Sequence, residues 1–302
     1  MDLLPTPEQD EIVASIRSVL ADRHTLGEPA TEALWETAAA QGWFGLGVAE
    51  PDGGVGYSAV EEALLFIEIG RAGVPGPFLG TVLAAHLDPA HIAGGTKVSI
   101  AQREGDRVLV FDATDATHAV LLDDGSLVEL GPLTPEPSLD TLVPIATTGE
   151  VTTVATGGDR RLVSLLLAAE LAGIAAATTE QSVAYGIDRE QFGQPIGGFQ
   201  AVKHRCADMA VRAEAALTQV HYASLALADS SPDAAFHTES AVVVASRAAI
   251  DNAEINVQNH GGIGFTWEHT AHRYVTRARV LGALQGGLQR HLADLLDQPA
   301  SA

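Results

Sequence analysis

The sequence predicts a mostly α-helical protein with a small β region. Its parts are a helical N-terminal domain, a reduced middle β domain and a C-terminal four-helix bundle. Apolar residues recur at helical spacing up to about Leu87 and again from about Asp159, whereas short strand-like runs fill the stretch between them. The helical spacing and the short strand-like runs distinguish helix from strand, and the abundant alanine favours helix. We place the domains at residues 1–95, 96–157 and 158–302.

The N-terminal region opens with a helix-start signal, Thr6-Pro7-Glu8-Gln9. Threonine suits the N-cap, proline the first helical position, and glutamine at the third position can complete a capping box. Further helices are expected over about 28–41, which Gly42 ends, and over about 58–70. A glycine-rich turn at 51–56 separates them.

The middle region contains short runs rich in valine, leucine and isoleucine. They lie at 98–100, 107–110, 119–122 and 126–130. Aspartate, glycine and proline separate them, as is typical of turns between strands. We expect a small sheet of about four to seven strands.

The C-terminal region shows long helical patterns joined by short connections. They cover about 160–187, 200–229, 233–258, 266–282 and 285–296. Long helices with short connections pack as antiparallel neighbours, so this region predicts a four-helix-bundle core.

Charge excludes several partners. The 302 residues include 17 Lys and Arg against 39 Asp and Glu, a formal net charge of −22. Such a field repels nucleic acid and anionic membrane surfaces, so neither is an expected partner. No apolar run approaches the roughly 20 residues that a membrane span needs.

Other features indicate a cytoplasmic protein without a metal. Residues 1–5 are acidic and lack a signal-peptide pattern. The single cysteine, Cys206, excludes an intramolecular disulfide and is expected to be a packing residue in a reducing compartment. The eleven histidines show no metal-ligand spacing, although His269 and His272 come nearest to it, and we expect no metal site.

Two segments carry the most information about function. One reads Arg189-Glu190-Gln191-Phe192-Gly193-Gln194-Pro195-Ile196-Gly197-Gly198-Phe199-Gln200, and the other reads Gln258-Asn259-His260-Gly261-Gly262-Ile263-Gly264-Phe265-Thr266. Each places an arginine or glutamine beside glycines and an aromatic ring, at a break between two helical patterns. A guanidinium can grip a pyrophosphate, and a glycine pair lets the backbone approach a phosphate closely. The alternatives are an arginine that complements a helix dipole and an ordinary glycine C-cap.

These segments resemble the two signature segments of the acyl-CoA dehydrogenase family, flavoproteins that desaturate acyl-CoA thioesters. Residues 41–46, 50–56 and 68–71 are similar to the first domain of that family, so the resemblance covers most of the chain. It implies an acyl-CoA dehydrogenase-like fold and FAD as the cofactor. The residues that it implies for FAD binding are Arg189, Gln191, Phe192, Gln200, Gln258, Gly261 and Gly262.

The chain departs from the family in the middle region. The predicted β region is short, and no clear counterpart exists of the segments that hydrogen-bond the flavin ring in that family. The nearest candidates, residues 112–115 and 147–149, match poorly.

The usual catalytic base is also absent. Gln285 occupies the position where many relatives carry the catalytic glutamate, and glutamine cannot ionise. The other known position, in the first bundle helix, falls at about Val163, which is apolar. We therefore expect no catalytic residue in this chain. Asp159 and Glu170 are the alternatives for a displaced base, and Glu268 is expected to serve as a cap or ion-pair residue.

The chain thus resembles the short, base-less subunit of heterotetrameric (α2β2) acyl-CoA dehydrogenases of steroid-degrading actinobacteria. The resemblance implies α,β-desaturation of a bulky, steroid-derived acyl-CoA thioester in lipid metabolism. A homologous full-length subunit would supply the base and the flavin-ring pocket, this chain would supply the ADP-binding side, and an electron-transfer flavoprotein would take the electrons. Two alternatives remain open: a self-sufficient homo-oligomeric dehydrogenase with a displaced base, and a non-catalytic assembly or regulatory protein on the same fold.

Overall fold

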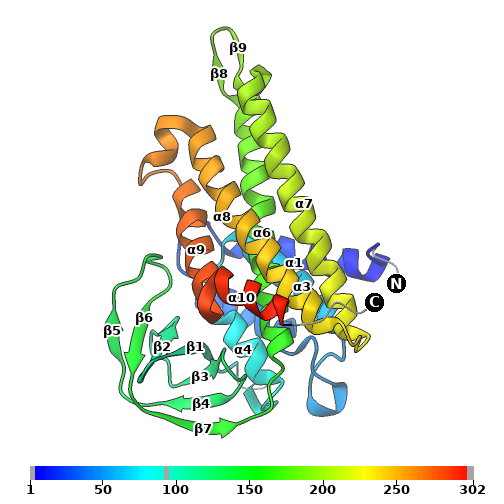
Figure 1. The fold of residues 1–302 in the computed structure, drawn as a ribbon, viewed down its shortest axis with the longest axis vertical. Coiled ribbons are helices and arrows are strands. Elements are labelled where there is room, and N and C mark those ends of the chain that lie inside the picture. Colours follow the sequence, from blue (N-terminus) through cyan, green and yellow to red (C-terminus); the bar gives the residue numbers. More distant parts are fainter. Residues whose placement is uncertain (1–3, 92–94, 298–302) are drawn as a thin grey trace.

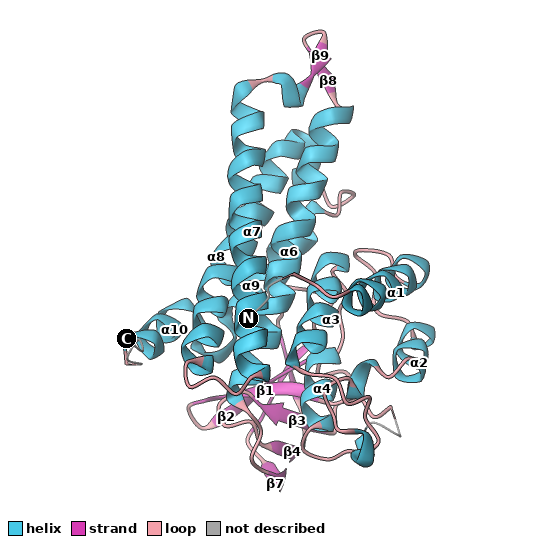
Figure 2. Ribbon diagram, turned by 90° about the vertical axis from the view of Figure 1, so that its right-hand side faces the viewer, coloured by secondary structure: helices cyan, strands magenta, loops and turns pink. Residues whose placement is uncertain are grey.

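The computed structural model describes residues 4–91 and 95–297. A long helical bundle stands on a small sheet, and the N-terminal helices pack beside the lower half of the bundle (Figures 1 and 2). This arrangement confirms the predicted fold class. Residues 1–3, on which the absence of a signal-peptide pattern partly depends, lie outside the described residues, as do the outer ends of the first and last predicted domains.

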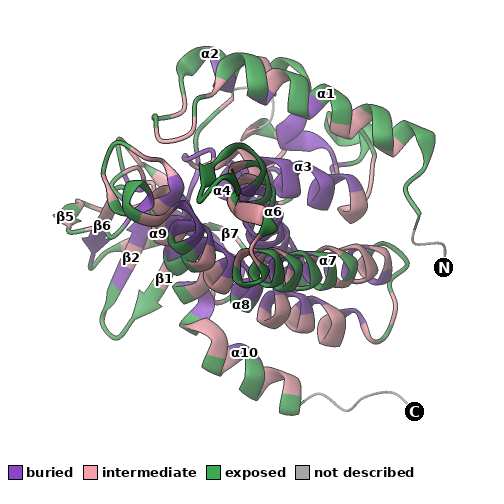
Figure 3. Ribbon diagram, turned by 90° about the horizontal axis from the view of Figure 1, so that it is seen from above, coloured by how far each residue is buried: buried purple, intermediate pink, exposed green. Residues whose placement is uncertain are grey.

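The N-terminal region is helical as expected. It contains α1 (Pro7–Arg23), α2 (Glu32–Ala40), α3 (Ala59–Ala72), α4 (Phe78–Ala85) and the 3-10 turns η1 (Trp43–Gly45) and η2 (Glu50–Asp52). The capping box at the start of α1 is confirmed, because Thr6 and Gln9 each accept the backbone N–H of the other. The predicted start of the second helix at residue 28 is wrong, since Thr31 caps α2 by accepting the N–H of Leu34. Figure 3 shows exposed α1 lying outside buried α3.

The middle region forms a seven-stranded sheet. Its strands are β1 (Ser99–Glu104), β2 (Arg107–Phe111), β3 (His118–Leu121), β4 (Leu127–Leu130), β5 (Thr134–Glu136), β6 (Ile145–Thr148) and β7 (Val151–Ala155). The order across the sheet is β5-β6-β2-β1-β3-β4-β7, and only β1 and β3 pair in parallel. Alternate residues divide between two cores: Ile100 and Val120 face the helices, whereas Ala101 and Leu121 belong to a smaller cluster.

The C-terminal region is the bundle. It contains α6 (Arg160–Asp188), the hairpin β8 (Glu190–Gln191) and β9 (Gln194–Pro195), η3 (Ile196–Gly198), α7 (Gln200–Ala228), α8 (Ala234–His260), η4 (Gly261–Phe265), α9 (Ala271–Ala283), η5 (Leu284–Gly286) and α10 (Gly287–Leu296). The predicted start of α9 at residue 266 is wrong, because Thr266 is extended and its hydroxyl donates back to the carbonyl of Ile263. The predicted start of α10 at Gln285 is also wrong, because that residue has a left-handed backbone.

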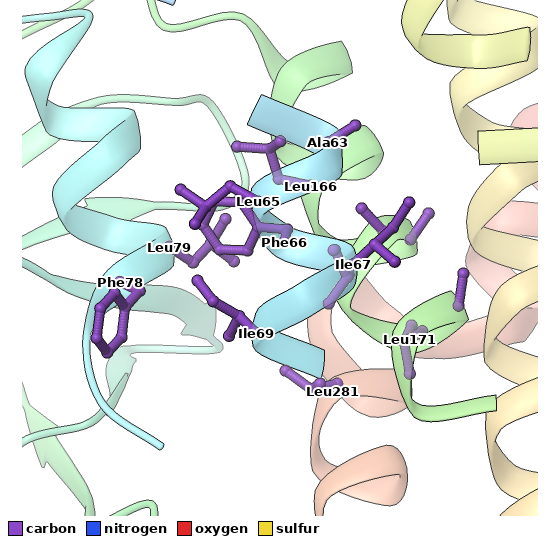
Figure 4. Packing of buried hydrophobic residues seen from close by; sticks show 14 of the residues in the cluster. Ala63, Leu65, Phe66, Ile67, Ile69, Phe78, Leu79, Leu166, Leu171 and Leu281 are labelled. Carbon is purple, nitrogen blue, oxygen red and sulfur yellow. The ribbon is translucent and has the colours of Figure 1, made fainter. Parts of the chain in front are cut away.

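Helix α6 is the core of the bundle and packs against α3, α7, α8 and α9. Among the described residues it is the one helix long and apolar enough to cross a membrane, and its whole apolar window is buried inside the protein. Figure 4 shows Phe66 of α3 between α4, which carries Phe78, and Leu166 of α6. The backbones of α3 and α6 touch, since a Cβ on Gly70 would lie 1.9 Å from the carbonyl oxygen of Glu170 and one on Gly173 would lie 2.0 Å from that of Ile67.

Candidate functional site

Both signature segments lie at the end of the bundle that is distant from the sheet (Figure 1). The first forms the β8–β9 hairpin between α6 and α7, and the second forms the end of α8 and η4. Tilted ring contacts join their bases: the centroids of Tyr185 and His260 are 4.3 Å apart at an interplanar angle of 31°, and those of His260 and His269 are 4.4 Å apart at 47°. The fold thus brings together two segments that lie about sixty residues apart in the sequence.

The hairpin presents its side chains to solvent. Arg189 is the C-cap of α6; its N–H donates to the Tyr185 carbonyl at 2.9 Å, and its own carbonyl accepts from Ile196 at 2.8 Å. The turn itself consists of Phe192 and Gly193, both at positive φ (54° and 79°). Two positive φ values suit the twist of a two-residue hairpin. The consequence is that the Phe192 ring is 93% exposed.

The second segment is equally open. Gly261 has a φ of 62°, and a Cβ built on Gly261 or Gly262 would meet nothing within 4 Å. Gln258, Gly262, Gln191 and Gln200 are exposed, and Gly261 is half-buried. The seven residues predicted to bind FAD therefore form an open surface at one end of one chain.

Large apolar side chains surround this surface. The most exposed are Ile187 (64%), Phe192 (93%), Ile263 (50%), Phe265 (71%) and Trp267 (78%). Contiguous exposed apolar groups rimmed by polar ones mark a surface that another molecule covers. The arrangement could stack a flat ring on Phe192 and hold an anion with Arg189, which are both exposed.

Gln285 lies at the other end of the bundle, in the turn between α9 and α10. The residue is 3% exposed and has a φ of 54°. Its backbone N–H donates to Oε1 of Gln102 on β1 at 3.1 Å. Its side-chain oxygen lies 3.3 Å from the hydroxyl of Ser164 on α6.

The orientation of the Gln285 amide follows from proton counting. Ser164 has one hydroxyl proton, yet Oε1 of Glu239 (3.0 Å) and Oε1 of Gln285 (3.3 Å) both require it as drawn. The carboxylate is the stronger acceptor. Turning the Gln285 amide by 180° resolves the conflict, because Nε2, which otherwise has no partner among residues 4–91 and 95–297, then donates to Ser164.

Glu239 and His291 complete this network. The Nδ1 atom of His291 on α10 lies 2.5 Å from Oε2 of Glu239 on α8. Burial by itself would raise the pKa of Glu239, but the hydrogen bond and charge of His291, together with Ser164, lower it below its ordinary value. Glu239 is therefore an ionised, hydrogen-bonded anchor, and the network around Gln285 ties α6, α8, α9 and α10 together.

Val163, which the resemblance implies lies at about the second base position, is apolar. Val163 is 2% exposed and lines a cavity of about 230 Å³ at the N-terminal end of α6. No ionisable group can act from this position.

The other carboxylates named above are engaged elsewhere. Asp159 caps α6, and its oxygens accept from the Arg161 guanidinium at 2.8 and 2.9 Å. Glu170 is 4% exposed and pairs with buried Arg277 at 3.1 Å; burial raises the pKa of Glu170, although Arg277 opposes this shift. Glu268 is exposed, and chiefly a hydrogen bond from its own backbone N–H lowers its pKa. The first two have structural partners, and the third lies in solvent.

The poorly matching segments 112–115 and 147–149 have internal roles. Asp112 accepts the Ser99 hydroxyl through its carbonyl at 3.0 Å. Thr147 donates to Glu136 at 3.3 Å, and the Thr148 hydroxyl donates to the carbonyl of residue 150 at 3.2 Å.

Sequence reasoning missed the residues that surround Gln285. Ser164 and Gln285 are 121 positions apart, and Glu239 and His291 are 52 apart. Such pairs leave no periodic signal. The one available hint was a serine within the apolar stretch that opens α6, because a polar group in a buried stretch must find a partner.

Comparison with known proteins identifies the family. The model of the acyl-CoA dehydrogenase C-terminal domain matches residues 163–298, and that of the N-terminal domain matches residues 6–95. Acyl-CoA dehydrogenase IpdE2 of Mycolicibacterium smegmatis is 32% identical over 314 residues, which cover 95% of this chain and 98% of that protein. The chain belongs to the acyl-CoA dehydrogenase family. Acyl-CoA dehydrogenase FadE34 of Mycobacterium tuberculosis is 36% identical over 285 residues, 83% of this chain but only 40% of FadE34.

Solved structures confirm the acyl-CoA dehydrogenase fold. A variant of the Tcur3481–Tcur3483 steroid ACAD has a TM-score of 0.82 at 23% identity, covering 96% of this chain and 97% of that one. The ChsE4–ChsE5 complex from Mycobacterium tuberculosis has a TM-score of 0.81 at 20% identity, covering 99% and 100%. Butyryl-CoA dehydrogenase from Megasphaera elsdenii has a TM-score of 0.77 at 17% identity, covering 98% of each chain.

Proposed function

We propose that this chain is the base-less subunit of a FAD-dependent acyl-CoA dehydrogenase complex. It contributes the ADP-binding side of the FAD site, and a homologous full-length subunit contributes the catalytic base. The observation that carries the proposal is the burial of Gln285 in hydrogen bonds to Gln102 and Ser164, because the resemblance implies that many relatives carry the catalytic base at this position.

The surface at the end of the bundle fits the nucleotide part of FAD. Arg189 offers an exposed guanidinium, Phe192 an exposed ring, and Gly261 and Gly262 an open backbone. Gln191, Gln200 and Gln258 add exposed amides, so the role of these residues is to hold and orient the cofactor. Bound FAD supplies the acceptor for a hydride from Cβ of the acyl group.

Proton removal from Cα falls to the partner. The amide of Gln285 is neutral at every physiological pH, and Val163 is a hydrocarbon. The carboxylates of Asp159 and Glu170 are held by Arg161 and Arg277. A carboxylate from the full-length subunit therefore acts as the base, in an α2β2 assembly that passes its electrons to an electron-transfer flavoprotein.

The relatives support a bulky substrate. One structural neighbour is described as a steroid ACAD, and another is a complex of two different chains. We infer that the complex desaturates a steroid-derived acyl-CoA thioester, and that it does so in the cytoplasm.

Co-expression tests the proposal. The chain is purified alone and together with candidate full-length acyl-CoA dehydrogenase subunits from the same organism. We expect no flavin absorbance from the isolated chain, and a yellow complex that reduces its flavin with a steroid-derived acyl-CoA. A yellow, active homo-oligomer would show that the chain is a self-sufficient enzyme. A stable chain that never acquires flavin with any partner would show that it is an assembly or regulatory protein.

A further inference from the structure

Three histidines meet where the second signature segment returns to the bundle. His260 ends α8, His269 lies in the loop before α9, and His272 lies in the first turn of α9. The ring centroids of His260 and His269 are 4.4 Å apart, and Nδ1 of His272 lies 2.7 Å from the carbonyl oxygen of His269. These contacts close the loop of residues 261–268, which joins α8 to α9 and carries the glycine pair and exposed apolar side chains (Figure 1).

His269 acts as the cap of α9. Thr270, the N-cap residue by position, makes no side-chain capping bond, and the backbone N–H of Ala271 donates to Nδ1 of His269 at 3.1 Å. A ring nitrogen can accept a hydrogen bond only when it carries no proton. The observed start of α9 therefore requires neutral His269 with Nδ1 unprotonated.

The surroundings of His269 oppose its protonation. Burial, followed by the charges of His260 and His272, lowers the pKa of His269 below its ordinary value. An imidazolium at this position would also lie at the positive end of the α9 dipole. Its Nδ1–H would face the N–H of Ala271, so two donors would meet where one hydrogen bond now exists.

The cluster has no carboxylate partner in the part of the chain that the structure describes. The histidines that pair with a carboxylate there are His86, His91 and His291. Next to the cluster, Glu268 is exposed and accepts from its own backbone N–H, and Arg273 of α9 donates to Thr141 at 3.0 Å. From α6, the neutral ring of Tyr185 contacts His260. A proton on His269 therefore meets no direct counter-ion among the described residues.

We propose that the histidine cluster is an acid-sensitive switch, in which a proton on His269 removes the acceptor of the Ala271 N–H and opens the loop of residues 261–268. The loop stays closed at neutral and alkaline pH. Its closed state loses stability as the pH falls below the ordinary imidazole pKa of about 6.5, because the open state then binds the proton more readily. Opening displaces Gly261 and Gly262 and so weakens the cofactor surface; this consequence, unlike the switch itself, rests on the function proposed above.

Hydrogen exchange of the full-length chain, in the form in which it purifies, tests the switch between pH 8 and pH 5. Exchange times are scaled to the intrinsic amide rate at each pH, and peptides covering residues 261–275 report on the loop and on the amide of Ala271. We expect their opening constant to rise below pH 6.5 by up to about tenfold for each pH unit, the limit for one proton. An opening constant independent of pH overturns the switch. An equal rise in peptides from the middle of α6 would mean global unfolding and overturns it as well.

Two variants assign the effect to His269. His269→Asn offers an amide oxygen that can accept from Ala271 at any pH, so the acid-induced rise should disappear while the loop stays closed. His269→Phe keeps a ring without an acceptor, so the loop should be open at every pH. The matched control is His204→Asn, which alters an exposed histidine on α7 and should keep the pH dependence of wild type. A wild-type pH profile in folded His269→Asn would show that His269 is not the sensor.

Flavin retention by the assembled complex over the same pH range separates the switch from the proposed function. Loss of FAD that accompanies loop opening supports both. Opening without loss of FAD supports the switch and removes the glycine pair from the cofactor site. Loss of FAD without opening contradicts the switch.

Discussion

Arg189 ends α6 with its backbone hydrogen-bonded and its guanidinium exposed. If the guanidinium binds the FAD pyrophosphate, Arg189→Ala removes a charge-assisted pair worth about 1.5–3 kcal/mol. We expect the affinity of the assembled complex for FAD to fall roughly tenfold to a hundredfold. Flavin content after dialysis against graded FAD measures this change.

Arg23→Ala is the matched control, because Arg23 is also an exposed arginine at the last turn of a helix. It should leave FAD affinity unchanged. Equal flavin content in Arg189→Ala and wild type would remove Arg189 from the cofactor site.

The carboxylates of this chain should be dispensable for proton abstraction. Asp159→Asn, Glu170→Gln and Glu268→Gln should each keep the turnover of the folded complex within about tenfold of wild type, because loss of a general base costs about 10²–10⁴-fold. Glu170→Gln should also lower the free energy of unfolding by about 3–5 kcal/mol, since it leaves Arg277 unpaired in the core. Stopped-flow flavin reduction and urea unfolding separate the two effects.

Gln285→Glu completes this test. It should not create activity in the isolated chain, because the new carboxylate would be buried beside Ser164 and ionised Glu239. A single carboxylate whose removal abolishes flavin reduction without unfolding the complex would contradict the division of labour between the subunits.

At the residue scale, sequence patterns identified the signature segments but did not predict the buried network around Gln285. Arg189 and Gln285 could be singled out because their neighbours form recognisable runs. The pairing of Glu170 with Arg277 could not, because 107 residues separate them. Side-chain packing decides which buried charges pair with each other, and no local sequence pattern predicts that packing.

At the element scale, the contact between α3 and α6 depends on two glycines. A Cβ on Gly173 would lie 2.0 Å from the Ile67 carbonyl oxygen, so Gly173→Ala must push the helices apart. We expect it to lower the free energy of unfolding by about 1–3 kcal/mol, as overpacking does. Urea denaturation monitored by circular dichroism measures the loss.

Gly186 supplies the control within the same helix. A Cβ there would meet its nearest atom at 3.6 Å, an ordinary van der Waals contact. Gly186→Ala should therefore stabilise the chain by about 0.5–1 kcal/mol through helix propensity. If Gly173→Ala and Gly186→Ala changed the free energy of unfolding equally, the role of Gly173 would not be to allow the close approach of α3 and α6.

Helix and strand positions followed from periodicity, but several boundaries did not. The starts of α2 and α9 moved inward because Thr31 and Thr266 form local hydrogen bonds that the apolar pattern does not encode. With β5, β6 and β7, the number of strands in the sheet still lies within the predicted range. These three strands were not predicted individually, because their runs are short and polar. Pairing with neighbouring strands stabilises them, and their own sequences do not encode that pairing.

At the scale of the whole molecule, the three regions meet at a buried charge cluster. Arg277 of α9 donates to the Val74 carbonyl at 2.8 Å and pairs with Glu170 of α6. Asp112, which follows β2, is acted on by the charges of the same cluster. Burial raises the pKa of Asp112 to about 6, with the charges of Glu170 and Asp140 adding to this and Arg277 opposing it.

The raised pKa makes ionised Asp112 a cost to the folded state. The cost is present above a pH of about 6 and disappears as the pH falls below the ordinary carboxyl range. Asp112→Asn should therefore raise the free energy of unfolding by about 1–3 kcal/mol at alkaline pH, and the difference from wild type should shrink in acid. Urea unfolding at several pH values from acid to alkaline follows the difference.

Asp115→Asn is the control for this pH series, because Asp115 is exposed and has nearly the same backbone, with a φ of 55° against 53°. It removes a carboxylate from a similar backbone conformation without removing a buried charge, so it reports any effect of the backbone position alone. If the difference in free energy of unfolding between Asp112→Asn and wild type did not vary with pH, the buried charge cluster would not destabilise the folded protein.

The burial of α6 also bears on how the chain is made. This helix finishes at residue 188, whereas α8, which covers much of it, finishes at residue 260. At translation rates of about 5–20 residues per second, the nascent chain carries α6 without its α8 cover for roughly 4–14 s. A chain ended by a premature stop codon before α8 should therefore aggregate, even though every residue of the N-terminal and β regions is present.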